Sequence, residues 1–174
     1  MIGSIEVSQD VDPDADPSLF EATTKIIQGN AGTQVVYVTV NGFDTHSLQV
    51  PRQEFLLRIV SQGLADMFDA LEESGHAENT LALVVSEFGR RVSENGSAGT
   101  DHGRGGLSFL LGPPVRRSRV IGEPDLSDLV DGDLQITFDA RTIYDSALRW
   151  LGASSEQVVE ILDDEWRDRS LLRS

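Results

Sequence analysis

Two groups in this sequence place an aspartate and a histidine close together. One residue separates Asp44 from His46, and Asp101 directly precedes His102. Imidazole nitrogen binds zinc or manganese, and carboxylate oxygen binds most divalent cations, calcium and magnesium included. The alternative is that each aspartate forms an Asx turn and each histidine is an ordinary loop residue. The residue pattern leaves both interpretations open.

A third segment, Ser-Glu-Phe-Gly-Arg-Arg at residues 86–91, adds one carboxylate and two guanidinium groups. Glu87 would join the two Asp-His pairs as a further metal ligand. The guanidinium forks of Arg90 and Arg91 match the geometry of a phosphate or sulfate oxyanion. The alternative for both arginines is ion pairing with nearby Glu94 or with the helix edge. In a hydrolytic site, we expect the catalytic roles to fall to Glu87 and Arg90.

The composition excludes several other kinds of chemistry. The chain of 174 residues has no cysteine, which removes disulfides, thiolate catalysis and cysteine-type zinc sites. Its 29 acidic and 14 basic side chains give a formal charge of −15, which argues against binding to nucleic acid or to an anionic membrane surface. It has neither an apolar run of spanning length nor a signal peptide, so a cytoplasmic protein is the default expectation.

A β-branched or apolar run precedes each part of the chain that carries the candidate residues. Residues 35–40 read Val-Val-Tyr-Val-Thr-Val and residues 81–85 read Leu-Ala-Leu-Val-Val, both typical of strands buried on two faces. Between them, residues 51–75 carry apolar side chains every three or four positions, as in a long helix. Strand, helix and strand make a βαβ unit, so we predict an α/β fold with a mainly parallel sheet and flanking helices. The candidate residues would meet at the carboxyl ends of its strands.

The rest of the chain divides into a leader and one domain. Residues 1–17 are rich in aspartate without a helical or strand period, and we expect a flexible acidic leader there. Residues 18–174 are expected to form a single α/β domain. Its further elements are a helix from Ser18 to Gly29, a functional loop at 89–106, a strand at 107–111, an irregular stretch at 115–133, and helices from Asp139 to Gly152 and from Ser154 onward.

Several of these motifs, in this order, resemble the bacterial family called domain of unknown function 1501. The resemblance runs from about Phe20 to Leu162. The segments that carry it are Gly-Phe-Asp-Thr-His at 42–46, Ser-Glu-Phe-Gly-Arg-Arg at 86–91, Glu-Asn-Gly-Ser at 94–97, Gly-Thr-Asp-His-Gly at 99–103, Asp-x-Arg-x-x-Tyr at 139–144 and Trp-Leu-Gly at 150–152.

This resemblance implies an alkaline phosphatase-like or sulfatase-like fold. Proteins of that superfamily use divalent metals at the carboxyl ends of a parallel sheet to hydrolyse phosphate or sulfate esters. Asp44 and His46 resemble two of their ligands, and His102 resembles the final histidine of the site. Glu87 and Phe88 stand where an Asp-His pair is expected. Since phenylalanine cannot bind a metal, a second ion would lack one ligand.

The resemblance covers the C-terminal half of such proteins, because their early strand with a Ser or Thr nucleophile should precede this part. We therefore expect a metal-dependent hydrolase-type domain that has weak or no activity alone, with a phosphate or sulfate ester as its ligand. The alternative is a non-catalytic binding module that dimerises or docks onto an N-terminal partner segment through an exposed sheet edge. Full-length relatives are often exported, whereas this chain begins without a leader of that kind.

Overall fold

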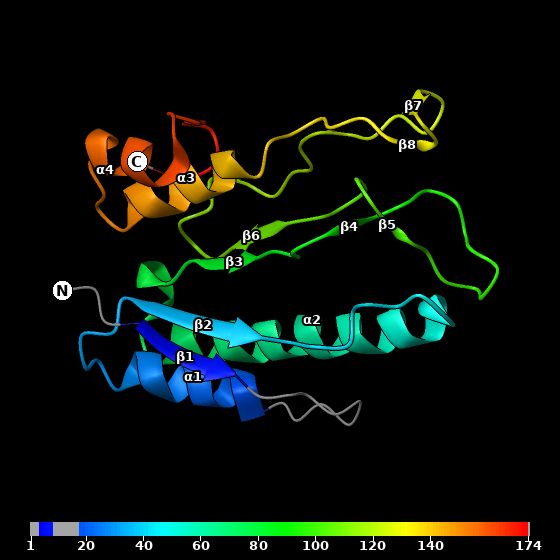
Figure 1. Ribbon diagram of the computed structural model, residues 1–174. Helices are drawn as coiled ribbons and strands as arrows, with labels where there is room; N and C mark the ends of the chain where they lie inside the picture. Colours follow the sequence, from blue (N-terminus) through cyan, green and yellow to red (C-terminus); the bar gives the residue numbers. More distant parts are fainter. Residues whose placement is uncertain (1–3, 9–17, 174) are drawn as a thin grey trace. The chain divides into compact units, whose positions relative to one another are not determined.

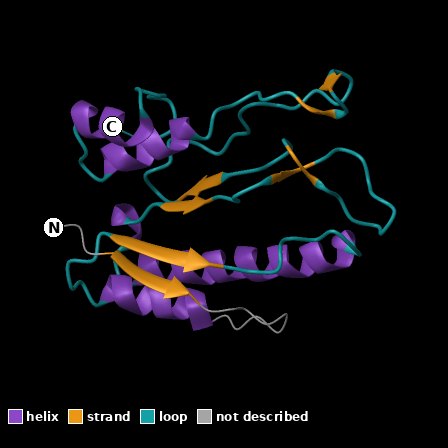
Figure 2. Ribbon diagram, in the orientation of Figure 1, coloured by secondary structure: helices purple, strands orange, loops and turns teal. Residues whose placement is uncertain are grey.

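The computed structural model consists of helices and short strands and describes residues 4–8 and 18–173 (Figure 1). None of the helices within these ranges is long and apolar enough to cross a membrane. Figure 2 shows them together with the strands, which are β1 (Ser4–Ser8), β2 (Val35–Thr39), β3 (Ala82–Val84), β4 (Gly89–Arg90), β5 (His102–Gly103), β6 (Phe109–Leu111), β7 (Leu129–Val130) and β8 (Asp133–Leu134). The helices are α1 (Ser18–Gln28), α2 (Gln49–Glu73), α3 (Arg141–Trp150), α4 (Ser155–Leu162) and the 3₁₀ turn η1 (Ala77–Asn79).

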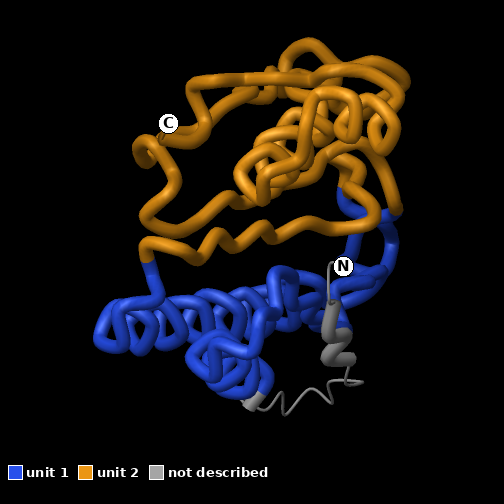
Figure 3. The backbone as a smooth tube through the Cα atoms, turned by 90° about the vertical axis from the view of Figure 1, so that its left-hand side faces the viewer, with its two compact units in different colours: residues 1–77, 94–101 blue, residues 78–93, 102–174 orange. Residues whose placement is uncertain are grey.

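The chain divides into two compact units, coloured separately in Figure 3. Unit 1 holds the described residues up to Ala77 together with residues 94–101. Unit 2 holds residues 78–93 and 102–173. The single domain expected over residues 18–174 is therefore described as two units. Because residues 94–101 belong to unit 1, the loop expected to carry function contributes to both.

Unit 1 is built on the packing of α1 against α2. The apolar stripe predicted for the long helix is confirmed, since Leu56, Met67 and Leu71 are buried. Val60 and Leu64, from the same stripe, pack against the cluster that also contains Phe20 of α1. The predicted start at Pro51 is two residues late, because α2 begins at Gln49. Burial of this stripe supplies the main apolar driving force for the unit.

Gly63 lets α1 and α2 approach closely, and its replacement is expected to destabilise unit 1. A Cβ at this position would lie 2.6 Å from Cγ and Cε2 of Phe20. We expect Gly63→Ala to lower the free energy of unfolding by up to about 2 kcal/mol, because an overpacking cost of about 1–3 kcal/mol is only partly offset by a gain in helix propensity of about 1 kcal/mol. Urea denaturation measures this change.

The matched control for this substitution is Gly106→Ala. The nearest atom to a Cβ at Gly106 is the Gly89 Cα at 3.7 Å, an ordinary contact distance. A Gly63→Ala protein as stable as Gly106→Ala would contradict close packing of Phe20 on α2.

The strand predicted at 35–40 is present as β2, but its surroundings differ from the prediction. The burial on both faces is wrong, because Tyr37 is 58% exposed and the other strand residues are only partly buried. Residues 4–8, expected to be part of an irregular leader, form β1 and pair with β2 in parallel, with Ser4 opposite Val35. The alternating Ser-Ile-Glu-Val-Ser of β1 carries the period of a strand. The remaining leader residues, 1–3 and 9–17, lie outside the described residues.

The strand pairing in unit 2 differs from the expected parallel sheet. The predicted strand at 81–85 is present as β3, but it is half-buried and pairs antiparallel with β6, so that Leu83 faces Leu110. Pairs β4–β5 and β7–β8 are antiparallel too. Within the described residues, β1–β2 is the parallel pair. Apolar β-branched runs identify strands, but not which strand becomes the neighbour.

Helix α3 of unit 2, which is followed by α4, carries a buried carboxylate. Asp145 is fully buried, and its carboxylate accepts hydrogen bonds from Arg149 Nε at 2.6 Å and from the Trp166 backbone N–H at 3.0 Å. The hydrogen bond with Asp145 raises the pKa of Arg149. The predicted cap of α4 is confirmed, because Ser154 and Gln157 form a complete capping box.

Candidate metal site

Asp44 and His46 are presented by a tight turn between β2 and α2. The Thr45 N–H donates to the Phe43 carbonyl at 2.9 Å, and the His46 N–H donates to the Asp44 carbonyl at 3.2 Å. Thr45 is 1% exposed, whereas the side chains of Asp44 and His46 are both about half exposed. The buried threonine anchors the turn, so the residues on either side of it project outward together.

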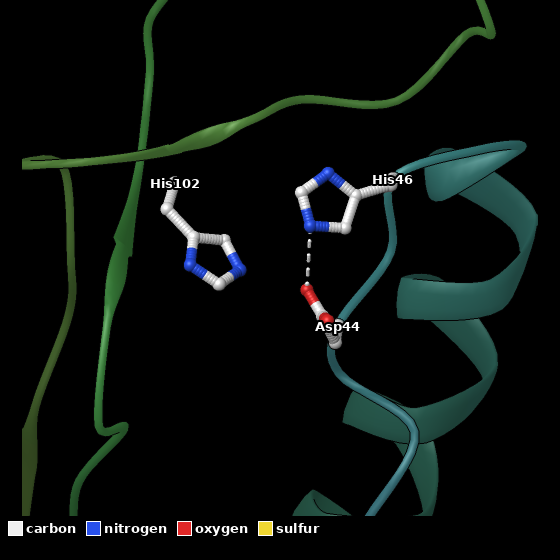
Figure 4. A group of neighbouring side chains, drawn as sticks. All are labelled: Asp44, His46 and His102. Atoms are coloured by element: carbon white, nitrogen blue, oxygen red, sulfur yellow. Dashed lines mark ion pairs between the residues drawn. The ribbon is translucent and has the colours of Figure 1, made fainter.

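The imidazole of His46 lies between two carboxylates of unit 1. Its Nε2 is 3.0 Å from Asp44 Oδ1, the contact drawn as a dashed line in Figure 4. Its Nδ1 is 3.4 Å from Oδ1 of Asp101. Asp101 is 55 residues away along the chain. Residues 94–101 therefore bring the second predicted Asp to the first predicted Asp-His group.

Asn95 holds residues 94–101 in place beside His46. Its Nδ2 donates to the His46 carbonyl at 3.0 Å and to Asp101 Oδ1 at 3.2 Å. Its Oδ1 accepts from the N–H groups of Ser97 and Gly99 at 2.9 and 3.1 Å. One side chain thus closes its own loop and connects it to both members of the His46–Asp101 contact. The sequence placed Asn95 only within the functional loop predicted at 89–106, because the distant partners of an amide side chain leave no mark in the local pattern.

The same loop supplies the hydrogen bonds that begin α2. The Leu48 N–H donates to the Ser97 carbonyl at 3.1 Å, and the Gln49 N–H donates to the Ala98 carbonyl at 2.9 Å. Leu48 and Ala98 both adopt left-handed backbone conformations, with φ of 46° and 56°. Such conformations cost a non-glycine residue about 1–2 kcal/mol and persist where surrounding bonds impose them. The junction next to His46 is therefore tightly constrained by non-local hydrogen bonds.

In unit 2, His102 and Arg90 are organised around Phe88. Strands β4 and β5 place Arg90 opposite His102. The His102 ring stacks on Phe88 at a centroid distance of 3.9 Å and an interplanar angle of 11°. The Arg90 guanidinium carbon lies 4.9 Å from the centre of the Phe88 ring. Phe88, which stands where the resemblance implies a histidine ligand, thus orients two of the predicted site residues.

The predicted site residues fall into two groups. Asp44, His46 and Asp101 are in contact within unit 1, and Glu87, Arg90 and His102 belong to unit 2. Glu87 is exposed on the segment between β3 and β4. Within unit 1, Asp44 and Asp101 contact opposite nitrogens of His46, so these two carboxylates lie on different sides of the imidazole. Arg91 donates to the Asp131 carbonyl at 2.6 Å, a partner that neither interpretation of its sequence position named.

Two of the predicted ligands are exposed histidines, and a third is an exposed carboxylate. These are Asp44, His46 and His102, whose side chains are drawn in Figure 4. His102 belongs to unit 2 and is the next residue after Asp101 of unit 1. The Asp44–His46 contact supplies one carboxylate and one imidazole, and His102 supplies a second imidazole. Zinc and manganese prefer donors of these types.

Comparison with protein families identifies the chain. Neither the curated proteins nor the solved structures gave a match. The model of one family, described as protein of unknown function (DUF1501), matches residues 26–170, which is most of the 174-residue chain. The chain therefore belongs to the DUF1501 family.

Proposed function

We propose that this chain binds a divalent cation through Asp44, His46 and His102 and serves the hydrolysis of phosphate or sulfate esters, as in alkaline phosphatase-like and sulfatase-like proteins. The observation that carries the proposal is the Asp44–His46 contact. Two ligand atoms bound to one tetrahedral zinc ion at about 2.0–2.1 Å lie about 3.3 Å apart. The 3.0 Å between Asp44 Oδ1 and His46 Nε2 is close to that separation.

His102 completes the proposed ligand set through the continuity of the chain. Asp101 contacts His46, and consecutive Cα atoms lie about 3.8 Å apart, so the next side chain starts near the same imidazole. Three protein ligands are typical of catalytic zinc sites, which keep one position open for water or substrate. A bound divalent ion supplies Lewis-acid polarisation of an ester oxygen.

Arg90 and Glu87 have the remaining roles in this proposal. Arg90 would bind the oxyanion, because a guanidinium forms paired hydrogen bonds with phosphate or sulfate oxygens. The contacts of Phe88 with both Arg90 and His102 couple the oxyanion position to the metal ligand. Glu87 is exposed and is available as a general base or a further carboxylate ligand.

Calorimetric titration of metal-stripped protein with zinc and manganese tests the proposal. We expect micromolar or tighter binding by the wild type. His46→Ala and His102→Ala should each weaken it more than about 100-fold, since losing a ligand costs at least as much as losing an outer-shell partner, which is about 10- to 100-fold. His76→Ala is the matched control, because His76 lies beyond the end of α2 beside Ser74. Its affinity should equal that of the wild type.

The second candidate function is the binding module that dimerises. It is favoured by three apolar side chains of unit 2, Leu107, Val120 and Ile136, which are each about three-quarters exposed. A wild type that binds neither metal would contradict the hydrolase proposal and favour this candidate, provided that light scattering finds a dimer. Binding that survives His46→Ala would mean that the ion occupies another site.

A further inference from the structure

The two carboxylates that contact His46 are not equivalent. The two nitrogens of an imidazole point away from each other, so a single ion cannot occupy both. Asp44 contacts Nε2 and Asp101 contacts Nδ1. Distance alone does not choose between them, because contacts of 3.0 and 3.4 Å both suit two ligands of one ion. The surroundings of each carboxylate distinguish the two sides.

Asn95 makes the Nδ1 side unfavourable for a cation. Its Nδ2 donates to the same Asp101 oxygen that contacts His46, at 3.2 Å. This bond takes up one acceptor direction of Asp101 Oδ1 and helps to hold that oxygen beside Nδ1, so fewer of its lone-pair directions remain for an ion. Asn95 also bonds the His46 carbonyl, which fixes the backbone from which the imidazole projects. Both bonds hold the Asp101 carboxylate and the His46 backbone in an arrangement in which Asp101 can accept an imidazole N–H.

We propose that Asp101, held by Asn95, is a positioning residue that accepts the Nδ1–H of His46 and thereby presents Nε2 to the ion. The claim that Nε2 binds an ion rests on the proposed function, whereas the hydrogen bond between Nδ1–H and Asp101 does not. Asp101 then has an orienting role instead of the ligand role that the sequence predicted. Hydrogen bonding of the second nitrogen to a carboxylate fixes the tautomer and ring orientation of metal-binding histidines. Asn95 is the residue that sets this carboxylate in position.

The first test uses metal-free protein and reads the protons on the ring nitrogens by long-range ¹H–¹⁵N NMR. The chain has three histidines, so the signals of His46 can be assigned by their loss in His46→Ala. We expect a Nδ1–H signal that Asp101→Ala abolishes and that Asp44→Ala and Asp101→Asn preserve, because asparagine keeps an acceptor oxygen. A Nδ1 that carries no proton in the wild type, or a Nδ1–H indifferent to Asp101→Ala, would overturn the proposal.

The role of Asn95 is tested in the same experiment with Asn95→Asp. This substitution keeps the oxygen that accepts from the Ser97 and Gly99 N–H groups and removes the donor to Asp101. We expect the loop to stay closed while the Nδ1–H signal is lost or strongly shifted. An unchanged signal would show that Asn95 does not position Asp101.

Zinc affinity separates a positioning role from a ligand role. Asp101→Ala should weaken binding about 10- to 100-fold, whereas Asp101→Asn should stay within about fivefold of the wild type. Asp44→Asn should cost more than either, since it removes a charged ligand. If Asp101→Asn costs as much as Asp44→Asn, Asp101 is a ligand and the proposal is wrong. If the wild type binds neither zinc nor manganese, the proposed function fails, and the NMR result alone decides the role of Asp101.

Discussion

Replacing Gly99 with alanine is expected to release residues 94–101 from the turn that carries His46. A Cβ at Gly99 would collide with the carbonyl carbon and oxygen of His46 and would lie 2.6 Å from the Ser47 nitrogen. These atoms belong to the backbone and cannot rotate away as a flexible side chain would. Overpacking of this kind costs about 1–3 kcal/mol, which corresponds to an opening constant increased about 5- to 150-fold.

Hydrogen exchange at two amides of the α2 start measures this release. The N–H groups of Leu48 and Gln49 donate to carbonyls of residues 97 and 98, so their exchange should accelerate by the same about 5- to 150-fold factor in Gly99→Ala. Gly96→Ala is the matched control in the same loop, since a Cβ there meets no atom within 4 Å. Equal exchange in the two variants would contradict the close contact between Gly99 and His46. This readout needs no metal.

Removing the buried carboxylate of Asp145 is expected to have the largest effect on stability. Asp145 is fully buried and bonds both Arg149 and the Trp166 N–H. Asp145→Ala would leave the Arg149 guanidinium, whose side chain is 15% exposed, with the Ser155 hydroxyl and the more distant Glu165 carboxylate. Breaking a buried ion pair by removing one partner costs about 3–5 kcal/mol. We expect a loss of that size in the free energy of unfolding measured by urea denaturation.

Glu165→Ala is the internal control for this network. Its carboxylate lies 3.4 Å from Arg149 and its side chain is 47% exposed, so solvent screens the interaction. Removing such a pair typically costs less than about 1 kcal/mol. If Asp145→Ala costs no more than Glu165→Ala, the buried ion pair does not hold α3 to the segment around Trp166.

The helices of this protein were largely predictable from sequence. The stripe on α2 follows from the 3.6-residue period, and the capping box of α4 follows from Ser154 and Gln157, three residues apart. Both signals are local, because a helix forms its hydrogen bonds within one segment. The predicted strands at 35–40 and 81–85 also exist as β2 and β3.

The partners of the strands depended on tertiary structure. A strand forms its hydrogen bonds with another segment, and its own sequence does not name that segment. The short alternating run of β1 became the parallel neighbour of β2, and β6 became the antiparallel neighbour of β3. The alkaline phosphatase-like fold stays a prediction.

The candidate site shows the same division between local and distant information. By itself, the sequence determined the donor types at Asp44, His46, Asp101 and His102, because imidazole and carboxylate chemistry belongs to the residue. Only the tertiary structure decided that Asp44 and Asp101 contact opposite nitrogens of His46 and that Asn95 holds the second contact. These roles depend on direction and on partners about 50 residues away, which the spacing of residues along the chain does not encode.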